Sequence, residues 1–285
     1  MKFGLFGINM GPCSRPETMA RVAEAAEGAG FDSVWTGEHV VLPDPRVPPS
    51  PLPPDYPMLD PAVALAFVAA RTKKLLLGTG IIILPQRNPL VLAKELASVD
   101  VLSGGRLVFG LGIGYLKPEF DALGIPFEEK GARSMEYLHA ILTLWTQPKP
   151  AYKGRFVSFG GVQALPQPMQ KPHPPVVIGG ASEPAFRRAV RYGDGWYGFA
   201  LDLDAASKCV AGLREASQEA GPRVASARSA ELEISVTPSG AVDLDTARRF
   251  ADIGVHRLIL FARARDEREA LAFIAEAERS LIGRV

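Results

Sequence analysis

The sequence predicts an α/β fold: a (β/α)8 TIM barrel that forms a single domain over residues 1–285, with insertions after the second strand and the fourth helix. Short β-branched or glycine-punctuated runs alternate with longer apolar runs of helical period, which gives eight strand–helix pairs. The 285 residues exceed the ~250 typical of such a barrel, which leaves room for both insertions. The competing architecture, a doubly wound open sheet, would place a Gly-rich phosphate turn after the first strand, where this chain has Asn9-Met10-Gly11-Pro12.

The apolar pattern of the first half predicts four strand–helix pairs. In the first helix Met19, Val22 and Ala26 fall on one stripe, and Gly30 supplies a stop. Pro61 is suited to the first position of the second helix. The expected strands and helices, in alternating order, are Lys2–Ile8, Glu17–Gly30, Asp32–Thr36, Ala62–Arg71, Leu75–Ile83, Pro89–Leu102, Arg106–Ile113 and Gly131–Trp145.

The second half repeats this alternation, so four more pairs complete the barrel. Strand runs are short and apolar, and each is followed by a segment with helical period. The expected strands and helices are Pro175–Gly179, Glu183–Tyr192, Gly195–Phe199, Ala205–Ala220, Glu231–Thr237, Thr246–Ile253, His256–Phe261 and Glu267–Leu281.

Two long connections lie outside this pattern. Pro43–Pro61, after the second strand, holds nine prolines in 19 residues. Proline fixes φ and lacks a backbone donor, so we expect a stiff loop over the barrel mouth, without helix or central strand. Gln147–Pro174, after the fourth helix, carries Tyr152–Phe159, which we expect to form a short hairpin.

The composition excludes several classes of protein. Hydrophobic residues make up 47% of the chain and the formal net charge is +1, which indicates a globular protein with no electrostatic attraction to nucleic acid or to anionic membranes. Apolar runs fall short of the ~20 residues of a membrane span, and we expect a cytoplasmic location. Cys13 and Cys209 are the only cysteines, and carboxylates or histidines at metal spacing are missing, so neither a disulfide nor a metal site is expected.

In a barrel of this kind the active site forms at the C-terminal ends of the strands. Glu38 and His39 follow the second strand directly, where an imidazole could exchange protons with a ligand. A loop histidine bonded only to backbone is the alternative. Gly179-Gly180-Ala181-Ser182 opens a helix and could receive a phosphate, although an ordinary tight turn with a serine cap has the same sequence.

Glycines alternate along two neighbouring strands, in Gly78-Thr79-Gly80 and in Gly110–Gly114. The second run places its third glycine one residue too early for a dinucleotide fingerprint. We interpret both runs as strands with one face free of side chains, against which a flat ring can lie. Plain barrel packing with small residues is the alternative interpretation.

These residues resemble the bacterial luciferase-like flavin and deazaflavin oxidoreductases, most closely the short members that use coenzyme F420. The resemblance covers residues 1 to about 200. It rests on Trp35-Thr36-Gly37-Glu38-His39, on Pro85-Gln86-Arg87-Asn88-Pro89, on Leu102-Ser103-Gly104-Gly105-Arg106 with the glycines that follow, and on the proline-rich approach to Gly179-Gly180.

The resemblance implies a flavin-like ring at the strand ends, with a non-proline cis peptide at Gly80-Ile81 behind it. Glu38 and His39 match the acidic and histidine positions near the reactive edge of the ring and are the expected catalytic residues; Glu38 would orient His39 or contact the ring. Where F420-dependent sugar-phosphate dehydrogenases have an acidic glutamate, this chain has Tyr115, which argues against a sugar phosphate. The expected cofactor-binding residues are Thr79, Gly80, Ile81, Gly112, Gly114, Tyr115, Gly179, Gly180, Ala181 and Ser182.

The expected function is therefore an F420-dependent oxidoreductase that transfers a hydride between the deazaflavin C5 and a small organic substrate. The excess of arginine over lysine, typical of GC-rich genomes whose hosts often make F420, favours F420 over FMN. An FMN-dependent luciferase-like monooxygenase and a non-catalytic flavin or F420 carrier are the alternatives. The carrier remains open because position 115 holds a tyrosine and no obvious second acid. Relatives commonly pair, so we expect a homodimer.

Overall fold

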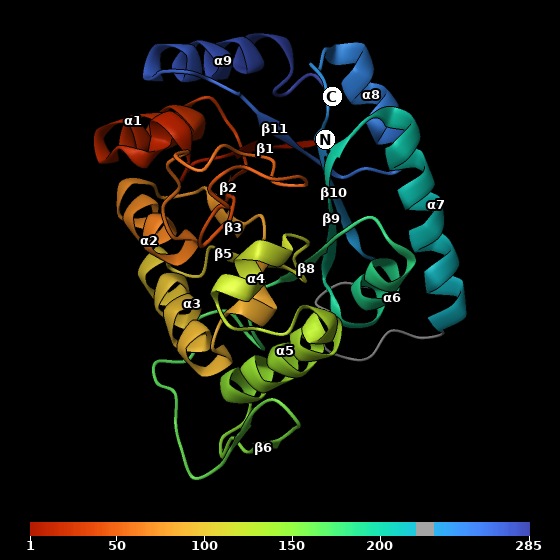
Figure 1. Cartoon of the computed structure of the whole chain (residues 1–285). Coiled ribbons are helices and arrows are strands. Elements are labelled where there is room, and N and C mark those ends of the chain that lie inside the picture. The colour runs from red at the N-terminus through yellow and green to blue at the C-terminus, as the bar shows by residue number, and fades with distance from the viewer. Residues whose placement is uncertain (221–230) are drawn as a thin grey trace.

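Parallel β-strands close into a barrel inside a ring of helices (Figure 1). The computed structural model describes residues 1–220 and 231–285. Neighbouring strands follow the order β3-β2-β1-β11-β10-β9-β8-β5-β4, and a pairing of β3 with β5 closes the barrel. The strands are β1 (Lys2–Phe6), β2 (Ser33–Thr36), β3 (Leu76–Thr79), β4 (Ile82–Ile83), β5 (Leu107–Gly112), β8 (Val176–Gly179), β9 (Gly195–Leu201), β10 (Glu233–Pro238) and β11 (Arg257–Phe261). The predicted eight-stranded (β/α)8 barrel is confirmed, with β3 and β4 as two parts of one barrel strand.

The helices begin and end where the sequence supplies local signals. The side chains of Asp60 and Asn88 accept hydrogen bonds from the first turns of α2 and α3, and both helices begin with proline. Gly104, with a φ of 71°, ends α3. The helices are α1 (Pro16–Gly28), α2 (Pro61–Arg71), α3 (Pro89–Ser103), α4 (Lys117–Ala122), α5 (Lys130–Thr146), α6 (Glu183–Tyr192), α7 (Leu203–Ala220), α8 (Leu244–Asp252) and α9 (Glu267–Ser280), with single 3-10 turns at Gly11–Ser14, Leu84–Gln86 and Phe127–Glu129.

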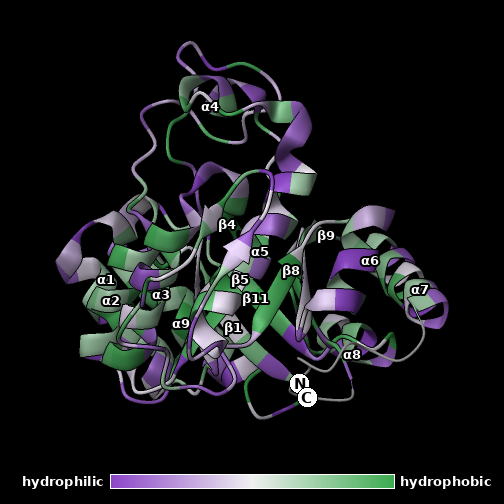
Figure 2. Cartoon of the chain, turned by 90° about the horizontal axis from the view of Figure 1, so that it is seen from below, coloured by the Kyte–Doolittle hydropathy of each residue, from purple (hydrophilic) through white to green (hydrophobic). Residues whose placement is uncertain are grey.

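The apolar core has an outer and an inner part. The outer part lies between strands and helices, whose apolar faces turn inward while hydrophilic residues cover the outside (Figure 2). The inner part fills the barrel with Trp35, Val108, Tyr197 and Ile259, among others. Below it the buried Arg257 guanidinium binds Asp32 at 2.7 Å and also pairs with Glu233. This network lies at the N-terminal ends of β2, β10 and β11, opposite the strand ends where the active site of such a barrel forms.

The third predicted strand, the region after β5 and the two insertions can be compared in detail with the sequence-based prediction. The strand predicted over Leu75–Ile83 is interrupted at Gly80-Ile81, which separates β3 from β4. Helix α4 was not predicted, because six residues are too few to show a helical period. The hairpin in the second insertion is confirmed as β6 (Tyr152–Lys153) paired antiparallel with β7 (Ser158–Phe159). The proline-rich segment carries turns and one isolated bridge, Met58 to Met10.

Candidate active site

The C-terminal ends of the strands form the barrel mouth. The two termini meet at the opposite end, where the Met1 amino group donates to the Val285 carbonyl at 3.0 Å, and Figure 2 shows α4 at the far side from them. The mouth has two unlike sides. Glycines end β2, β3, β5 and β8, namely Gly37, Gly80, Gly112, Gly114 and Gly179. Phenylalanines end β1 and β11, namely Phe6 and Phe261, and Phe199 lies two residues before the end of β9. The Phe6 ring centroid lies 5.0 Å from that of Phe199 and 5.1 Å from that of Phe261.

The glycine side is organised around one backbone bulge. The peptide bond between Gly80 and Ile81 is cis, as the resemblance implied. The bulge is anchored by Thr79, whose buried hydroxyl donates to the Gly110 carbonyl at 2.6 Å and accepts from the Gly110 amide at 2.8 Å. Because both bonding directions of this hydroxyl are used internally, the Thr79 side chain holds the bulge in place and does not face the mouth.

The interpretation of the glycines as a bare surface for a ring is wrong in its detail. A Cβ at Gly110 would lie 1.9 Å from the Thr79 carbonyl oxygen, and Cβ atoms at Gly112 and Gly179 would lie 2.6 Å and 3.1 Å from the Ile81 side chain. The strand glycines therefore make room for the chain's own bulge. The sequence pattern could not separate the two cases, since the occupant, Ile81, comes from a neighbouring strand. Ile81 itself is partly exposed, so any ring on this side would rest on its side chain.

His39 lies at the end of β2 and is held by a carboxylate that the sequence reasoning missed. Its Nδ1 is 3.1 Å from Oε2 of Glu119 on α4, and 9% of the His39 side chain is exposed. The other Glu119 oxygen accepts from the Val40 amide at 2.5 Å, and the carboxylate is fully buried. The Tyr115 ring stands perpendicular to the imidazole, with 6.1 Å between centroids. His39 is therefore oriented by Glu119 and borders a partly exposed phenol.

Glu38 does not orient His39. Its carboxylate accepts from the Ile83 amide and pairs with Arg87, whose Nε is 3.0 Å away, and Arg87 also binds Asp60 at 2.7 Å. Burial raises the pKa of the Glu38 carboxyl, and the charge of Arg87 acts in the opposite direction. Successive residues of an extended chain point to opposite sides, which explains why sequence neighbours have separate partners. Glu38 thus links β2 to β4 and to the end of the proline-rich segment.

The signal for Glu119 was present but unused. Position 115, directly after the strand glycines, is a tyrosine, and the acidic residue lies four positions further along the chain. Glu119 lies in the first turn of α4, where Pro118 favours a helix start. The carboxylate at the mouth therefore comes from the short helix and not from the end of the strand.

The turn after β8 leads into α6 as expected. Gly180 has a φ of +119°, its amide donates to the Tyr197 carbonyl at 3.3 Å, and its own carbonyl accepts from the Trp196 indole at 2.8 Å. Ala181 and Ser182 are exposed, and the Ser182 side chain makes no capping hydrogen bond. The Ser182 hydroxyl is accordingly available at the start of α6. Positions 184–186 offer no free amide, because Pro184 has no N–H and the Ala185 and Phe186 amides donate to the Ser182 carbonyl at 2.8 Å and 3.0 Å.

The described residues also show the state of the cysteines and whether metal-binding groups or membrane-spanning helices are present. Within residues 1–220 and 231–285, no group of three or more histidine, cysteine, aspartate or glutamate side chains could hold a metal ion. In the same ranges Cys13 and Cys209 are both free and buried, and no helix is long and apolar enough to cross a bilayer.

A model of luciferase-like monooxygenases matches residues 1–281. The chain belongs to this family. An uncharacterised protein of Mycobacterium tuberculosis is 32% identical over 281 residues, which cover 94% of this chain and 95% of the relative. The oxygenase component of a flavin-dependent trigonelline monooxygenase of Acinetobacter baylyi is 30% identical over 202 residues, 68% of this chain and 52% of that protein.

Solved structures of the luciferase-like type share the fold. A monooxygenase of Streptomyces bottropensis superposes with a TM-score of 0.79 at 24% identity, covering 99% of both chains. An F420-dependent secondary alcohol dehydrogenase superposes with a TM-score of 0.77 at 18% identity, covering 96% of this chain and 97% of that one. A Pseudomonas putida 3,6-diketocamphane monooxygenase in complex with FMN gives a TM-score of 0.66 at 21% identity, covering 83% and 66%. The family fold thus accommodates both F420 and FMN.

Proposed function

We propose that this chain is an F420-dependent oxidoreductase that transfers a hydride between the deazaflavin C5 and a small organic substrate. The observation that carries the proposal is the His39–Glu119 pair at the barrel mouth. A carboxylate on Nδ1 fixes the tautomer with the proton on that nitrogen. Nε2 has no hydrogen-bond partner among the described residues, and it is therefore the atom that can accept a proton from the substrate or return one.

The residues at the mouth fit a flat ring that carries a ribityl phosphate. Ile81 offers a partly exposed apolar surface on the bulge, and Ser182 offers an unpartnered hydroxyl at the start of α6. We assign the ring to the bulge side and the phosphate to the turn after β8. The residues assigned to the ring are Gly80, Ile81 and Tyr115, and those assigned to the phosphate are Gly179, Gly180, Ala181 and Ser182. Gly112 and Gly114 are not assigned to the ring, because the space beside them is taken by Ile81, Ile83 and Phe120.

The cofactor, when bound, supplies the ring carbon that takes up or releases the hydride. The chain's own residues position the substrate and handle the proton. Glu119 is buried and holds the imidazole at a fixed orientation, so that Nε2 can exchange a proton with a substrate oxygen without reorganisation. Glu38 acts at a distance, because its bonds to Ile83 and Arg87 fix the backbone beside the bulge.

An FMN-dependent monooxygenase is the second candidate. The likeness to the trigonelline monooxygenase component and to the FMN complex of the diketocamphane enzyme favours it. The non-catalytic carrier is less favoured, because the buried Glu119 holds His39 in an orientation suited to proton exchange.

Parallel titrations with F420 and FMN, followed by quenching of tryptophan fluorescence, test the choice of cofactor. We expect F420 to bind at least tenfold more tightly than FMN. Tighter binding of FMN, together with oxygen uptake when reduced flavin is supplied, would support the monooxygenase instead. Failure of both cofactors to bind would reject both candidates.

His39→Ala tests the catalytic assignment. We expect turnover to fall about hundredfold, the lower end of what general acid–base groups contribute, while the Kd of the cofactor stays within about twofold. The matched control is His139→Gln on α5, whose ring packs on Tyr192 outside the mouth. Equal turnover in the two variants would remove His39 from the mechanism.

We also propose that two copies pair through α2 and α3. Val63, Phe67 and Val91 are exposed on these adjacent helices, at 67%, 38% and 56%. Burying such a patch is favourable and is typical of a subunit interface. Light scattering should give about twice the chain mass for the wild type and the single mass for Val63→Lys/Phe67→Glu. A monomeric wild type would contradict this pairing.

A further inference from the structure

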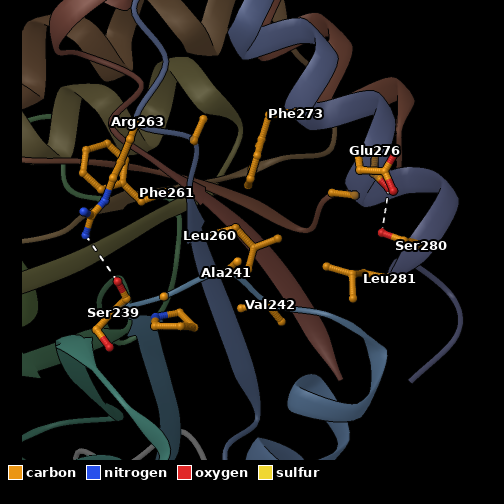
Figure 3. A pocket seen from close by; sticks show the side chains of 14 residues that line it. Ser239, Ala241, Val242, Leu260, Phe261, Arg263, Phe273, Glu276, Ser280 and Leu281 are labelled. Atoms are coloured by element: carbon orange, nitrogen blue, oxygen red, sulfur yellow. Dashed lines mark hydrogen bonds between the residues drawn. The ribbon is translucent and has the colours of Figure 1, made fainter.

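A groove runs along the outer side of β11, away from the His39–Glu119 pair. It lies between α9 and the segment that joins β10 to α8, and Figure 3 shows it from Arg263 at one end to Leu281 at the other. Its volume is about 360 Å³, within the range of ~300 to 1,000 Å³ that small-molecule sites occupy. The groove is therefore large enough for a ligand of its own.

The two walls of the groove belong to different parts of the chain. α9, which packs against α1, forms one wall, and the segment that joins β10 to α8 forms the other. This segment brings the small residues Ser239, Gly240 and Ala241 to the groove, followed by Val242. The walls themselves are apolar, with Val242, Leu260, Phe273, Ala277 and Leu281. The length and lining suit a linear hydrocarbon chain.

One end of the groove carries a cation. Arg263 has a φ of 47°, in the left-handed region that side chains seldom adopt, and its exposed guanidinium donates to the Ser239 carbonyl at 3.4 Å. The guanidinium also lies 5.8 Å from the centre of the Phe261 ring. In Figure 3 it extends across the end of the groove towards Ser239.

Arg263 differs from the arginines around it. Arg265 is paired with Glu269, and Arg279 with Glu276 at the other end of the groove. Across residues 1–220 and 231–285, no carboxylate lies within ion-pair distance of Arg263. An apolar channel with one uncompensated guanidinium at its end is complementary to a molecule with an apolar tail and one anionic head, because a guanidinium binds a carboxylate through two parallel hydrogen bonds.

We propose that this groove binds a linear amphiphilic carboxylate of medium chain length, with the carboxylate at Arg263 and the tail along α9. The residues that line the groove include neither His39 and Glu119 nor the residues proposed for the cofactor. Binding to the groove can therefore be measured in the apoprotein and in the His39→Ala variant alike.

Titration calorimetry with three ligands of equal length, namely octanoate, 1-octanol and octylammonium, tests the proposal on the wild-type protein. We expect octanoate to bind with one site per chain, 1-octanol to bind at least tenfold more weakly, and octylammonium not to bind. Absence of octanoate binding, or equal affinity for octanoate and 1-octanol, would overturn the proposal.

Variants then locate the site. Arg263→Gln should weaken octanoate about tenfold and leave 1-octanol unchanged, whereas Ala277→Phe should weaken both by filling the groove. Ala241→Leu, at an exposed position, gives the same test of filling if Ala277→Phe fails to fold. Arg265→Gln is the matched charge control and should bind octanoate like the wild type. Octanoate binding that is indifferent to Arg263→Gln and to groove filling would place the ligand elsewhere and reject the assignment.

Discussion

Two buried carboxylates lie on opposite sides of the end of β2, and their surroundings give them different tasks. Glu38 is surrounded by fixed donors: a backbone amide and a guanidinium that also serves Asp60. One oxygen of Glu119 accepts a hydrogen bond from the Val40 amide, and the other is bonded to the His39 imidazole at the mouth. The bonds of Glu38 hold the end of β2 against β4 and Arg87, whereas Glu119 is bonded to a side chain that can gain and lose a proton. Burial alone therefore does not separate the two carboxylates; the proposed roles rest on their different partners.

The largest effect is expected for Glu38→Ala, and it should be an effect on stability. Removing one partner of a buried pair typically costs ~3–5 kcal/mol of unfolding free energy, and we expect about 3 kcal/mol because Arg87 keeps Asp60. Urea unfolding measures it. Arg71→Gln, which removes the exposed pair with Glu24, is the control and should unfold at the wild-type urea concentration. Equal midpoints for both variants would contradict the structural role of Glu38.

A smaller effect, on turnover, is expected for Glu119→Gln. The amide oxygen can still accept from Val40, but the charge beside the imidazole is lost, so turnover should fall about thirtyfold with little change in stability. Glu129→Gln, at a partly exposed site between α4 and α5 where the carboxylate pairs with Arg133 and Arg155, is the control. Two results together would contradict the different roles of the two carboxylates. Glu119→Gln would lower the unfolding free energy as much as Glu38→Ala does, and its turnover per folded molecule would equal that of the wild type.

The smallest effect is expected for Tyr115→Phe. Burial, and secondarily the charge of Glu119, raises the pKa of the Tyr115 phenol above its ordinary value of 10.0, so the hydroxyl keeps its proton until the pH exceeds that value. Turnover should fall about threefold, as for one neutral hydrogen bond, with the same pH profile as the wild type from about pH 6 to about pH 9. A basic limb below pH 9 that disappears in the variant would show that Tyr115 titrates during the reaction.

The fold could be predicted because its signals are local. The alternation of short apolar runs with helical stripes located the strands and helices within a few residues, and Pro61 and Gly30 marked a helix start and a helix end. The cis peptide at Gly80-Ile81 followed from the resemblance, since nothing in two adjacent apolar positions encodes it.

The site was harder to predict because its contacts are distant in the chain. Glu119 lies 80 residues from His39, and only the barrel brings them together. The glycines of β5 indicate that space for a side chain is needed there, but they do not indicate which residue fills it. In the structure the Ile81 side chain fills the space beside Gly112. Sequence adjacency suggested that Glu38 and His39 cooperate, whereas the alternation of an extended chain sends them apart.

The bond between Arg87 and Asp60 has a consequence for how this enzyme type can diversify. Asp60 closes the proline-rich segment, and Asn9 additionally binds the Leu59 carbonyl at 2.6 Å, so the segment is fastened at its exit to the barrel frame. Insertions or deletions upstream, between Pro43 and Tyr56, can then be absorbed without displacing β2 or the imidazole. Under the proposed function, changes confined to that stretch would leave the His39–Glu119 pair in place.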